Sequence, residues 1–143
     1  MFLGEYERTL DEKCRLTVPC ELRHGLTSGA VLARSFDNCL CIYPNSEWER
    51  VARAIEDLPE IRFESREIAR EIYSGAAACS LDRQGRVTIP VYLRERAQLA
   101  EHVVVAGVGR RVEIWSREAW LERRDNFETE RTRRAEMLSI SAV

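Results

Sequence analysis

The chain contains one sequence unit twice. The ten residues 10–19, Leu-Asp-Glu-Lys-Cys-Arg-Leu-Thr-Val-Pro, return at 81–90 as Leu-Asp-Arg-Gln-Gly-Arg-Val-Thr-Ile-Pro, 71 residues further on. Aromatic residues that end Val/Ile/Leu-rich runs match at a spacing of 72: Tyr43 and Trp48 with Trp115 and Trp120. Any surface that the unit carries is therefore presented twice, and two weak contacts on one rigid body bind as one stronger contact.

The length of the chain limits how the two copies can fold. A half of about 70 residues has difficulty burying a sufficient core alone, so we expect the two halves of this 143-residue chain to share one core. The expected organisation is repeat 1 over 1–48, linking helices over 49–74, repeat 2 over 75–120, and a charged C-terminal helix or disordered tail over 121–143.

Each repeat opens with two short β-patterned runs around a polar turn. The runs cover 5–10 and 15–18 in the first repeat and 76–81 and 86–89 in the second, which predicts a β-hairpin in each. Gly85 suits a turn position with positive φ. Cys14 stands at the equivalent position, and it must either adopt that conformation at some cost or use another turn.

The rest of each repeat predicts a short helix and two strands. Pro19 and Pro90 can stand in the first turn of helices near 20–26 and 91–98. Strands are expected over 30–36 and 39–43, and over 102–107 and 111–115. The unit is thus β-β-α-β-β followed by a helix, and the predicted fold class is mostly β with peripheral α.

Three longer helices are expected outside this β unit. The first begins at Asn45 or Ser46, where Ser46 and Glu49 form a capping box, and it ends at Pro59. The second covers about 64–73, and the third begins near Ser116. Beyond about 126 the charged sequence has little apolar periodicity, which predicts a frayed helix or disorder.

Tryptophans and cysteines are candidates for chemistry, and both are better explained by packing. Three tryptophans could form a base-stacking platform, but they recur at strand-to-helix junctions, which favours a core role: Trp48, Trp115 and Trp120. The five cysteines have no paired C-x-x-C spacing, which favours free thiols over a metal site: Cys14, Cys20, Cys39, Cys41 and Cys79. We expect no metal and no cofactor.

Charge and hydropathy restrict the class of protein. The net charge of −2 and pI near 5.8 argue against a protein that coats nucleic acid by bulk attraction. Residues 45–74 carry five Arg against eight Asp/Glu, whereas residues 82–96 carry four Arg against two, so an anion-binding surface belongs in the repeated segments. No apolar run is long enough to span a bilayer, and the N-terminus lacks the layout of a signal peptide, so we expect a cytoplasmic protein.

The repeated Asp-x-x-x-Arg pattern is the strongest functional candidate. Asp11 with Arg15, and Asp82 with Arg86, would pin each turn by a surface ion pair. The same turn would project cations from a two-stranded ribbon that fits the major groove of DNA, where arginine bonds guanine or phosphate. The candidate DNA-binding residues are Lys13, Arg15, Arg83 and Arg86, and the candidate loop-structuring residues are Asp11, Asp82 and Gly85.

The chain carries several motifs in a fixed order: Met-Phe-Leu-Gly-Glu-Tyr at the start, Leu-Asp-x-Lys-x-Arg-Leu-Thr-Val-Pro, Cys-Leu-x-Ile-Tyr-Pro-x-x-Glu-Trp, Ser-Gly-Ala, Leu-Asp-x-x-Gly-Arg-x-x-Ile-Pro and Glu-Ile-Trp-Ser. Together they resemble the MraZ family of bacterial transcriptional regulators, part of the AbrB-like group. The resemblance covers about residues 1–122. It implies an AbrB-like double-split β-barrel to which one chain supplies both halves.

The resemblance also implies a function. Its DNA-binding motif falls on Asp11 with Arg15 and on Asp82 with Arg86, and the family's glycine is present as Gly85 but replaced by Cys14. It implies a nucleoid-associated regulator that binds double-stranded DNA at direct repeats upstream of the division and cell wall gene cluster, as a ring-like homo-oligomer. Repression and activation both stay open.

Two other function classes are alternatives to a DNA-binding regulator. AbrB-like barrels also serve as antitoxins, so the charged segment 126–143 could bind a protein partner, although the antitoxins of this fold carry one unit per chain. An enzyme is not expected, because the sequence has no Ser/His/Asp set, phosphate-binding glycine loop or metal-ligand spacing. No small-molecule substrate and no membrane contact are expected either.

Overall fold

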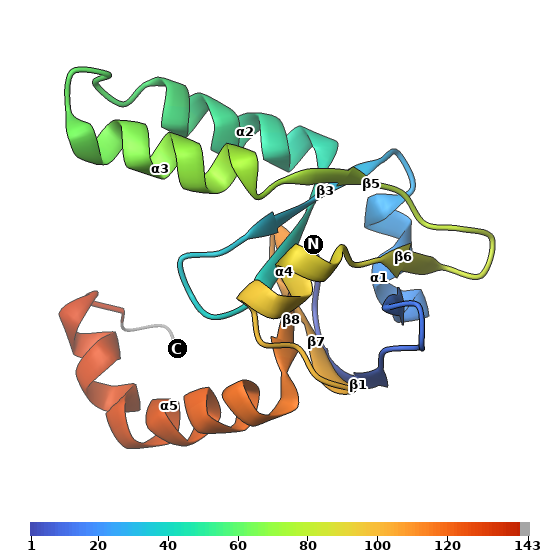
Figure 1. Ribbon diagram of the computed structural model, residues 1–143. Coiled ribbons are helices and arrows are strands. Elements are labelled where there is room, and N and C mark those ends of the chain that lie inside the picture. The colour runs from blue at the N-terminus through green and yellow to red at the C-terminus, as the bar shows by residue number, and fades with distance from the viewer. Residues whose placement is uncertain (141–143) are drawn as a thin grey trace.

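Each repeat contributes two strands, a short helix and two further strands to the computed structural model, which describes residues 1–140 (Figure 1). Repeat 1 contains β1 (Glu5–Thr9), β2 (Arg15–Thr17), α1 (Cys20–Arg23) with a 3-10 turn (His24–Leu26), β3 (Ala30–Arg34) and β4 (Leu40–Pro44). Repeat 2 contains β5 (Ala77–Cys79), β6 (Arg86–Thr88), α4 (Val91–Arg96), β7 (His102–Val108) and β8 (Arg111–Ser116). The predicted β-β-α-β-β unit, and a β core with helices around it, are confirmed.

The first two strands of each repeat pair with strands of the other repeat, so the two predicted hairpins are wrong. β1 pairs with β7 and β5 pairs with β3, in a six-stranded antiparallel sheet of order β1-β7-β8-β4-β3-β5. β2 pairs with β6 in a separate two-stranded ribbon. A hairpin within one repeat would leave its apolar face uncovered, whereas the shared ribbon lays that face on the sheet.

The core lies between the ribbon and the six-stranded sheet. The ribbon side contributes Leu16, Val18, Val87 and Ile89, each at most 2% exposed. The facing aliphatic side chains of the sheet are fully buried and come from both repeats: Leu32, Leu40, Ile42, Val105, Val112 and Ile114. Burial of each such side chain stabilises the fold by about 1.5–3 kcal/mol. This common core holds the ribbon in place.

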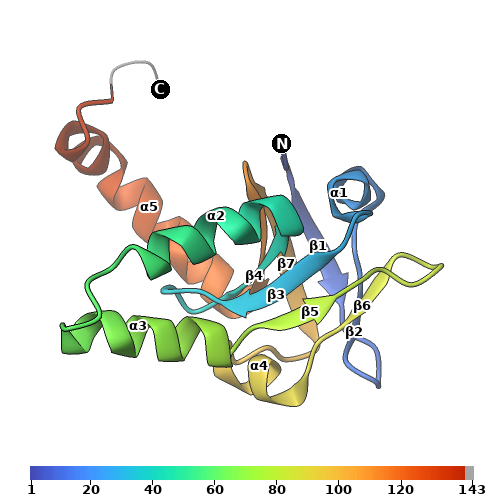
Figure 2. The same cartoon turned by 90° about the horizontal axis from the view of Figure 1, so that it is seen from above.

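Two linking helices lie side by side next to β3 and β4 (Figures 1 and 2). They are α2 (Asn45–Glu56) and α3 (Phe63–Ser74). Half-buried Trp48 packs between Tyr43 and Tyr73, with ring centroids 5.9 and 6.1 Å away. The predicted capping box is absent, because α2 begins directly after Pro44 and Ser46 therefore lies inside the helix.

The C-terminal helix α5 (Arg117–Met137) leaves the body of the molecule (Figure 2). Its first turn is capped by Ser116, whose hydroxyl accepts a hydrogen bond from the backbone N–H of Ala119 at 3.1 Å. The helix continues well past residue 126, so up to Met137 the structure agrees with the helical alternative of the prediction for this tail. Residues 141–143, the end of the predicted tail, lie outside the described residues.

Trp115 and Trp120 form a second, smaller cluster on the outer face of the sheet. Their rings are 5.8 Å apart and pack against Cys39, Val104 and Ala106. The core role predicted for these two tryptophans is confirmed. Within residues 1–140, the structure contains no helix with the length and apolarity that crossing a bilayer requires.

Candidate nucleic-acid interface

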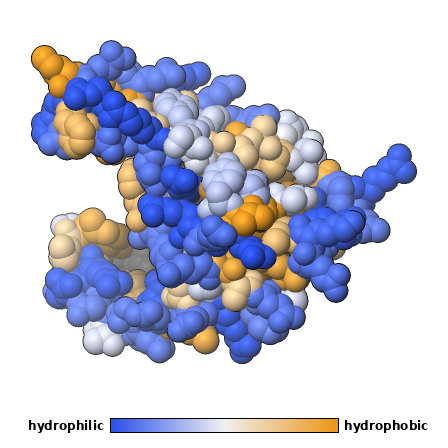
Figure 3. All heavy atoms as spheres, viewed as in Figure 1, coloured by the Kyte–Doolittle hydropathy of each residue, from blue (hydrophilic) through white to orange (hydrophobic). Residues whose placement is uncertain are grey.

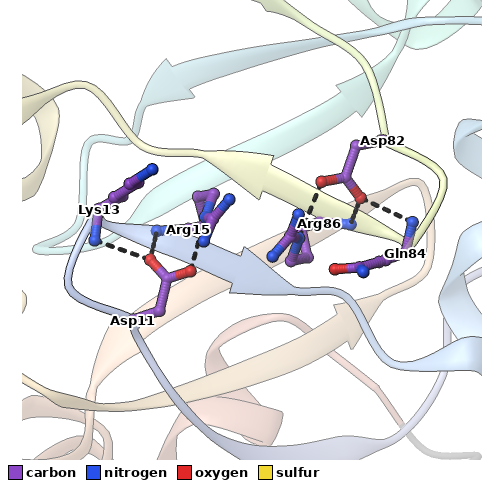
Figure 4. A network of polar contacts seen from close by, with 6 residues as sticks. All are labelled: Asp11, Lys13, Arg15, Asp82, Gln84 and Arg86. Carbon is purple, nitrogen blue, oxygen red and sulfur yellow. Dashed lines mark hydrogen bonds and ion pairs between the residues drawn. The ribbon is translucent and has the colours of Figure 1, made fainter.

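An aspartate organises each of the two repeated turns. Oδ1 of Asp11 accepts hydrogen bonds from the backbone N–H groups of Lys13 and Arg15, at 2.9 and 2.8 Å. Oδ1 of Asp82 accepts from the backbone N–H groups of Gln84 and Arg86, both at 2.9 Å (Figure 4). Short polar side chains that bond their own backbone two residues on favour such turns. The same local geometry is therefore built twice.

The second oxygen of each aspartate holds the arginine that follows the turn. Oδ2 of Asp11 accepts from Nε of Arg15 at 2.6 Å, and Oδ2 of Asp82 accepts from Nε of Arg86 at 2.8 Å. In residues 1–140 no hydrogen bond from the terminal Nη atoms of these two arginines is present. The carboxylate thus fixes the guanidinium through Nε and leaves the edge that recognises phosphate or guanine available.

These contacts keep both carboxylates charged. The backbone N–H of Arg15 is the main cause that lowers the pKa of Asp11 below its ordinary value, and the backbone N–H of Arg86 does the same for Asp82. The arginine side chains lower both pKa values further, and these contacts together outweigh the opposing effect of desolvation. Each turn therefore holds a permanent ion pair at neutral pH.

The two turns share a left-handed backbone residue. Gly85 has φ of 75° and Cys14 has φ of 57°, so Cys14 adopts the conformation that glycine takes in the other repeat. A non-glycine residue in this region costs about 1–2 kcal/mol. The first turn thus keeps the geometry of the second at the cost of backbone strain.

The ribbon formed by β2 and β6 places both arginines on one face. Arg15 lies opposite Thr88, and Arg86 lies opposite Thr17. Residues that face each other, or that are two apart on one strand, share a face of a sheet, so these four side chains point to the same side. Such diagonal neighbours lie roughly 7–8 Å apart. The two repeated motifs therefore bring both guanidinium groups to one surface, and Figure 4 shows the arginines between the two aspartates.

The other predicted site residues occupy the turns at the two ends of the ribbon. Lys13 and Arg83 are exposed, whereas Gly85 is buried. Lys13 shares its turn with the exposed acidic residue Glu12, while the turn of Arg83 has no acidic residue besides its structuring aspartate. The second turn is therefore the more basic of the two.

Comparison with known proteins agrees with this doubled architecture. The family model described as "MraZ protein, putative antitoxin-like" matches the chain twice, over residues 1–71 and 72–138. The chain belongs to the MraZ family. The boundary between the two matches reproduces the 71-residue repeat of the sequence.

MraZ relatives extend over most or all of the chain. It is 49% identical over 120 residues to a "Transcriptional regulator MraZ" of Roseiflexus castenholzii, which covers 84% of each chain. Proteins of the same name from Syntrophomonas wolfei and Herpetosiphon aurantiacus are 43% and 42% identical, over 90% and 100% of each chain. These MraZ proteins are named as transcriptional regulators, which is not a class of enzyme.

Four residues near this MraZ-type ribbon are absent from the site predicted from the sequence. Thr17 and Thr88 share the outer face with the arginines, and the alternation of polar and apolar residues within each strand would have pointed to them. Arg23 and Arg94 approach the turns from α1 and α4. Their own 71-residue spacing, equal to that of the MraZ repeat, would have pointed to them.

One group of potential metal ligands lies away from the ribbon. Ligand atoms of Cys39, Cys41 and Glu113 are within 4.8 Å of one another and are buried. The Glu113 carboxylate already accepts hydrogen bonds from Arg111 and from Nε1 of Trp115, both at 2.9 Å. A hydrogen bond with Cys41, together with burial, raises the pKa of the Cys39 thiol. These groups form a satisfied polar network beneath the sheet's outer face.

Proposed function

We propose that the chain is a sequence-specific transcriptional regulator that binds double-stranded DNA through the outer face of the β2–β6 ribbon. The observation that carries the proposal is the register of this ribbon, which places Arg15, Thr17, Arg86 and Thr88 on one side. Membership of a family whose relatives are named transcriptional regulators supports DNA as the partner. The proposal assigns DNA contact to the ribbon face and to Lys13 and Arg83 in the turns.

The dimensions and chemistry of the ribbon suit the major groove. This groove admits a two-stranded β-ribbon, and arginine bonds O6 and N7 of guanine in a bidentate manner. Threonine hydroxyls bond bases or phosphates, and lysine and arginine at the edges bind the phosphate backbone. In this arrangement Arg15 and Arg86 read bases or hold phosphate, while Asp11 and Asp82 fix the guanidinium groups.

A single ribbon should bind DNA weakly, because two arginines neutralise few phosphates. We propose that a ring-like homo-oligomer presents several ribbons to direct repeats in the promoter region upstream of the division and cell wall gene cluster. Repeats spaced by about 10 bp would place neighbouring ribbons on the same side of the duplex. The gain in affinity then comes from avidity, because the acidic chain as a whole does not attract DNA by its net charge. A protein that acts in this way would reside at the nucleoid.

The decisive experiment measures binding of the full chain to the DNA just upstream of its own gene at about 150 mM salt. A scrambled fragment of equal length serves as the reference, because nonspecific binding depends on salt and not on sequence. The expected result is preference for the upstream fragment and loss of that preference in the Arg15→Ala/Arg86→Ala double variant. Equal binding of both fragments by the wild-type chain would contradict the proposal.

The two single variants test whether the turns act equally. Arg86→Ala should lose more affinity than Arg15→Ala, because the second turn is more basic and Gly85 is not strained there. Thermal unfolding of each variant establishes that the fold is intact. A larger loss from Arg15→Ala would overturn this ranking.

A second candidate function is a protein-interaction module, as in an AbrB-like antitoxin. One observation favours it: an apolar hollow of about 610 Å³ at the end of α5, lined in part by Phe127, Ala135, Leu138 and Ile140. The face seen in Figure 3 is hollowed between the α2–α3 pair and α5. Co-purification of a small toxin with the full chain, and its loss from a chain that ends at Asp125, would favour this function over DNA binding alone.

A further inference from the structure

An arginine from each repeat lies over the turn of the other repeat. Arg23, on α1 of repeat 1, packs so closely on Gly85 of repeat 2 that a Cβ at residue 85 would overlap its guanidinium. Arg94, on α4 of repeat 2, donates a hydrogen bond from Nη1 to Sγ of Cys14 in repeat 1, at 2.8 Å. Each cationic turn is thus completed by the opposite half of the chain.

Hydrogen bonds to the backbone hold Arg23 beside Gly85 and keep Cys14 in place beside Arg94. The N–H of Val18 donates to the carbonyl of Gly85 at 2.9 Å, and Nε of Arg23 donates to the carbonyl of Val18 at 2.8 Å. At the other end of the ribbon, the N–H of Ile89 donates to the carbonyl of Cys14, also at 2.9 Å. The placement of Arg23 beside the second turn therefore follows from the ribbon itself and not from a surface rotamer alone.

The two helix arginines are cations without acidic partners. Both are half-buried, and no carboxylate within residues 1–140 lies within 4.0 Å of either guanidinium. An unpaired guanidinium beside Gly85, or beside Cys14, adds positive potential to the end of the ribbon where a DNA backbone would pass. Arginine binds phosphate through two parallel N–H donors, which requires free terminal nitrogens.

The two positions differ in whether those nitrogens are engaged. Arg23 is anchored through Nε, and among the described residues no hydrogen bond from its Nη atoms is present. Arg94 uses Nη1 for the thiol of Cys14, whose side chain stands where Gly85 has none. The residue at this turn position, Gly85 or Cys14, therefore decides whether the arginine packed on the turn keeps its terminal nitrogens free or uses one of them for a hydrogen bond.

We propose that each end of the ribbon carries a phosphate-binding position made by the turn of one repeat and the helix arginine of the other, and that the Arg23–Gly85 position is the stronger. This inference rests on the proposed DNA-binding function and extends it to Arg23 and Arg94. The ligand is a phosphodiester of the DNA backbone, so the contribution is independent of base sequence.

Salt dependence of DNA binding tests the proposal on the full chain. Each phosphate contact contributes about 0.9 to the slope of log K against log salt concentration. Arg23→Gln should reduce that slope by about one and weaken binding roughly tenfold, equally on the upstream and scrambled fragments. Arg94→Gln should weaken binding less than about threefold. The matched control is Arg53→Gln, which removes one charge from an exposed site on α2, away from the ribbon.

Exchange of the two turn residues provides the sharper test. In the Cys14→Gly/Gly85→Cys double variant, Arg94 loses its thiol partner and Arg23 is displaced by the new side chain. Arg94→Gln should then weaken binding more than Arg23→Gln does. If thermal unfolding shows that the double variant does not fold, the Cys14→Gly single variant replaces it. In that background Arg94→Gln should weaken DNA binding more than it does in the wild-type chain.

The outcomes separate this inference from the proposed function. An unchanged slope in Arg23→Gln, with upstream preference still lost in Arg15→Ala/Arg86→Ala, would overturn the inference and leave the function standing. A wild-type chain that binds neither fragment would overturn both. A ranking of Arg23 and Arg94 that does not reverse after the exchange would contradict the role assigned to Cys14.

Discussion

At the scale of single residues, the two aspartates control the geometry of the ribbon ends. Each carboxylate accepts hydrogen bonds from two backbone N–H groups and from one guanidinium Nε. These bonds both pair the backbone donors of the turn and orient the arginine. These bonds favour the charged form, so the pKa values of Asp11 and Asp82 are lower in the folded chain than in the unfolded chain. A single protonation would weaken both the turn and the arginine placement.

The stability of the fold should therefore depend on these two groups at acid pH. A carboxyl whose pKa is lowered by folding stabilises the fold above its unfolded value, about 3.9, and loses that contribution as pH falls through its folded value. The melting temperature of Asp11→Asn/Asp82→Asn should lie below that of the wild type at pH 7, and the difference should shrink below about pH 4. Melting curves between pH 7 and pH 3 measure this.

The control for this experiment is Glu60→Gln/Glu64→Gln, which removes two exposed carboxylates, one from the segment that links α2 to α3 and one from the first turn of α3. A difference between the aspartate variant and the wild type that stays constant down to pH 3 would contradict the assignment. So would an aspartate variant that is as stable as the wild type at pH 7.

At the scale of elements, α5 is attached to the body by its first turns alone. Trp120 is its one buried residue among those described, and Arg124 adds a surface ion pair with Glu5 at 3.3 Å. Exposed pairs of this kind contribute about 0–1 kcal/mol. The distal turns carry exposed apolar residues, including Leu138 and Met137, that do not join either core cluster. These turns therefore contribute little to the stability of the β core.

Removal of residues 126–143 should leave the melting temperature within a few degrees of the full chain, because the deleted part buries little apolar surface. Trp120→Ala should instead cost about 3–5 kcal/mol, since it empties a site packed against Trp115. Thermal and denaturant unfolding of the two variants provide the comparison. A truncation as destabilising as Trp120→Ala would show that the distal helix is part of the folded core.

At the scale of the whole molecule, neither repeat has a complete sheet of its own. The first strand of repeat 1 pairs with β7 of repeat 2, the first strand of repeat 2 pairs with β3 of repeat 1, and the ribbon takes one strand from each. The main core cluster also draws on both repeats. The two halves are thus interleaved, in contrast to two domains joined by a linker.

Separate polypeptides of residues 1–71 and 72–143 should each fail to unfold cooperatively as monomers, because each exposes strand edges and half of a core. Mixing them should restore the β-sheet circular dichroism signal and a cooperative transition, since all the contacts of the intact chain become available. Circular dichroism and sedimentation of each half, alone and mixed, provide the measurement. A half that folds alone as a monomer would refute the interleaved core.

The amino-acid sequence by itself determined the local features of this protein. The order β-β-α-β-β, the helices that follow Pro19 and Pro90, and the contact of Asp11 with Arg15 were all predictable from patterns within a few residues. Turn hydrogen bonds, positive φ at Gly85 and period-two alternation depend on neighbours in the chain, so short motifs specify them. The 71-residue repeat then extended each feature to the second half.

Only the tertiary structure decided which strands pair and what their pairing brings together. Alternating apolar and polar residues look the same whatever the partner strand, so β2 could be read as half of a hairpin although it pairs with β6. The partner is selected by the need to cover Leu16 and Val87 with the sheet. This nonlocal requirement places Arg15 and Arg86 on one face, and it carries Arg23 to Gly85 across the repeats.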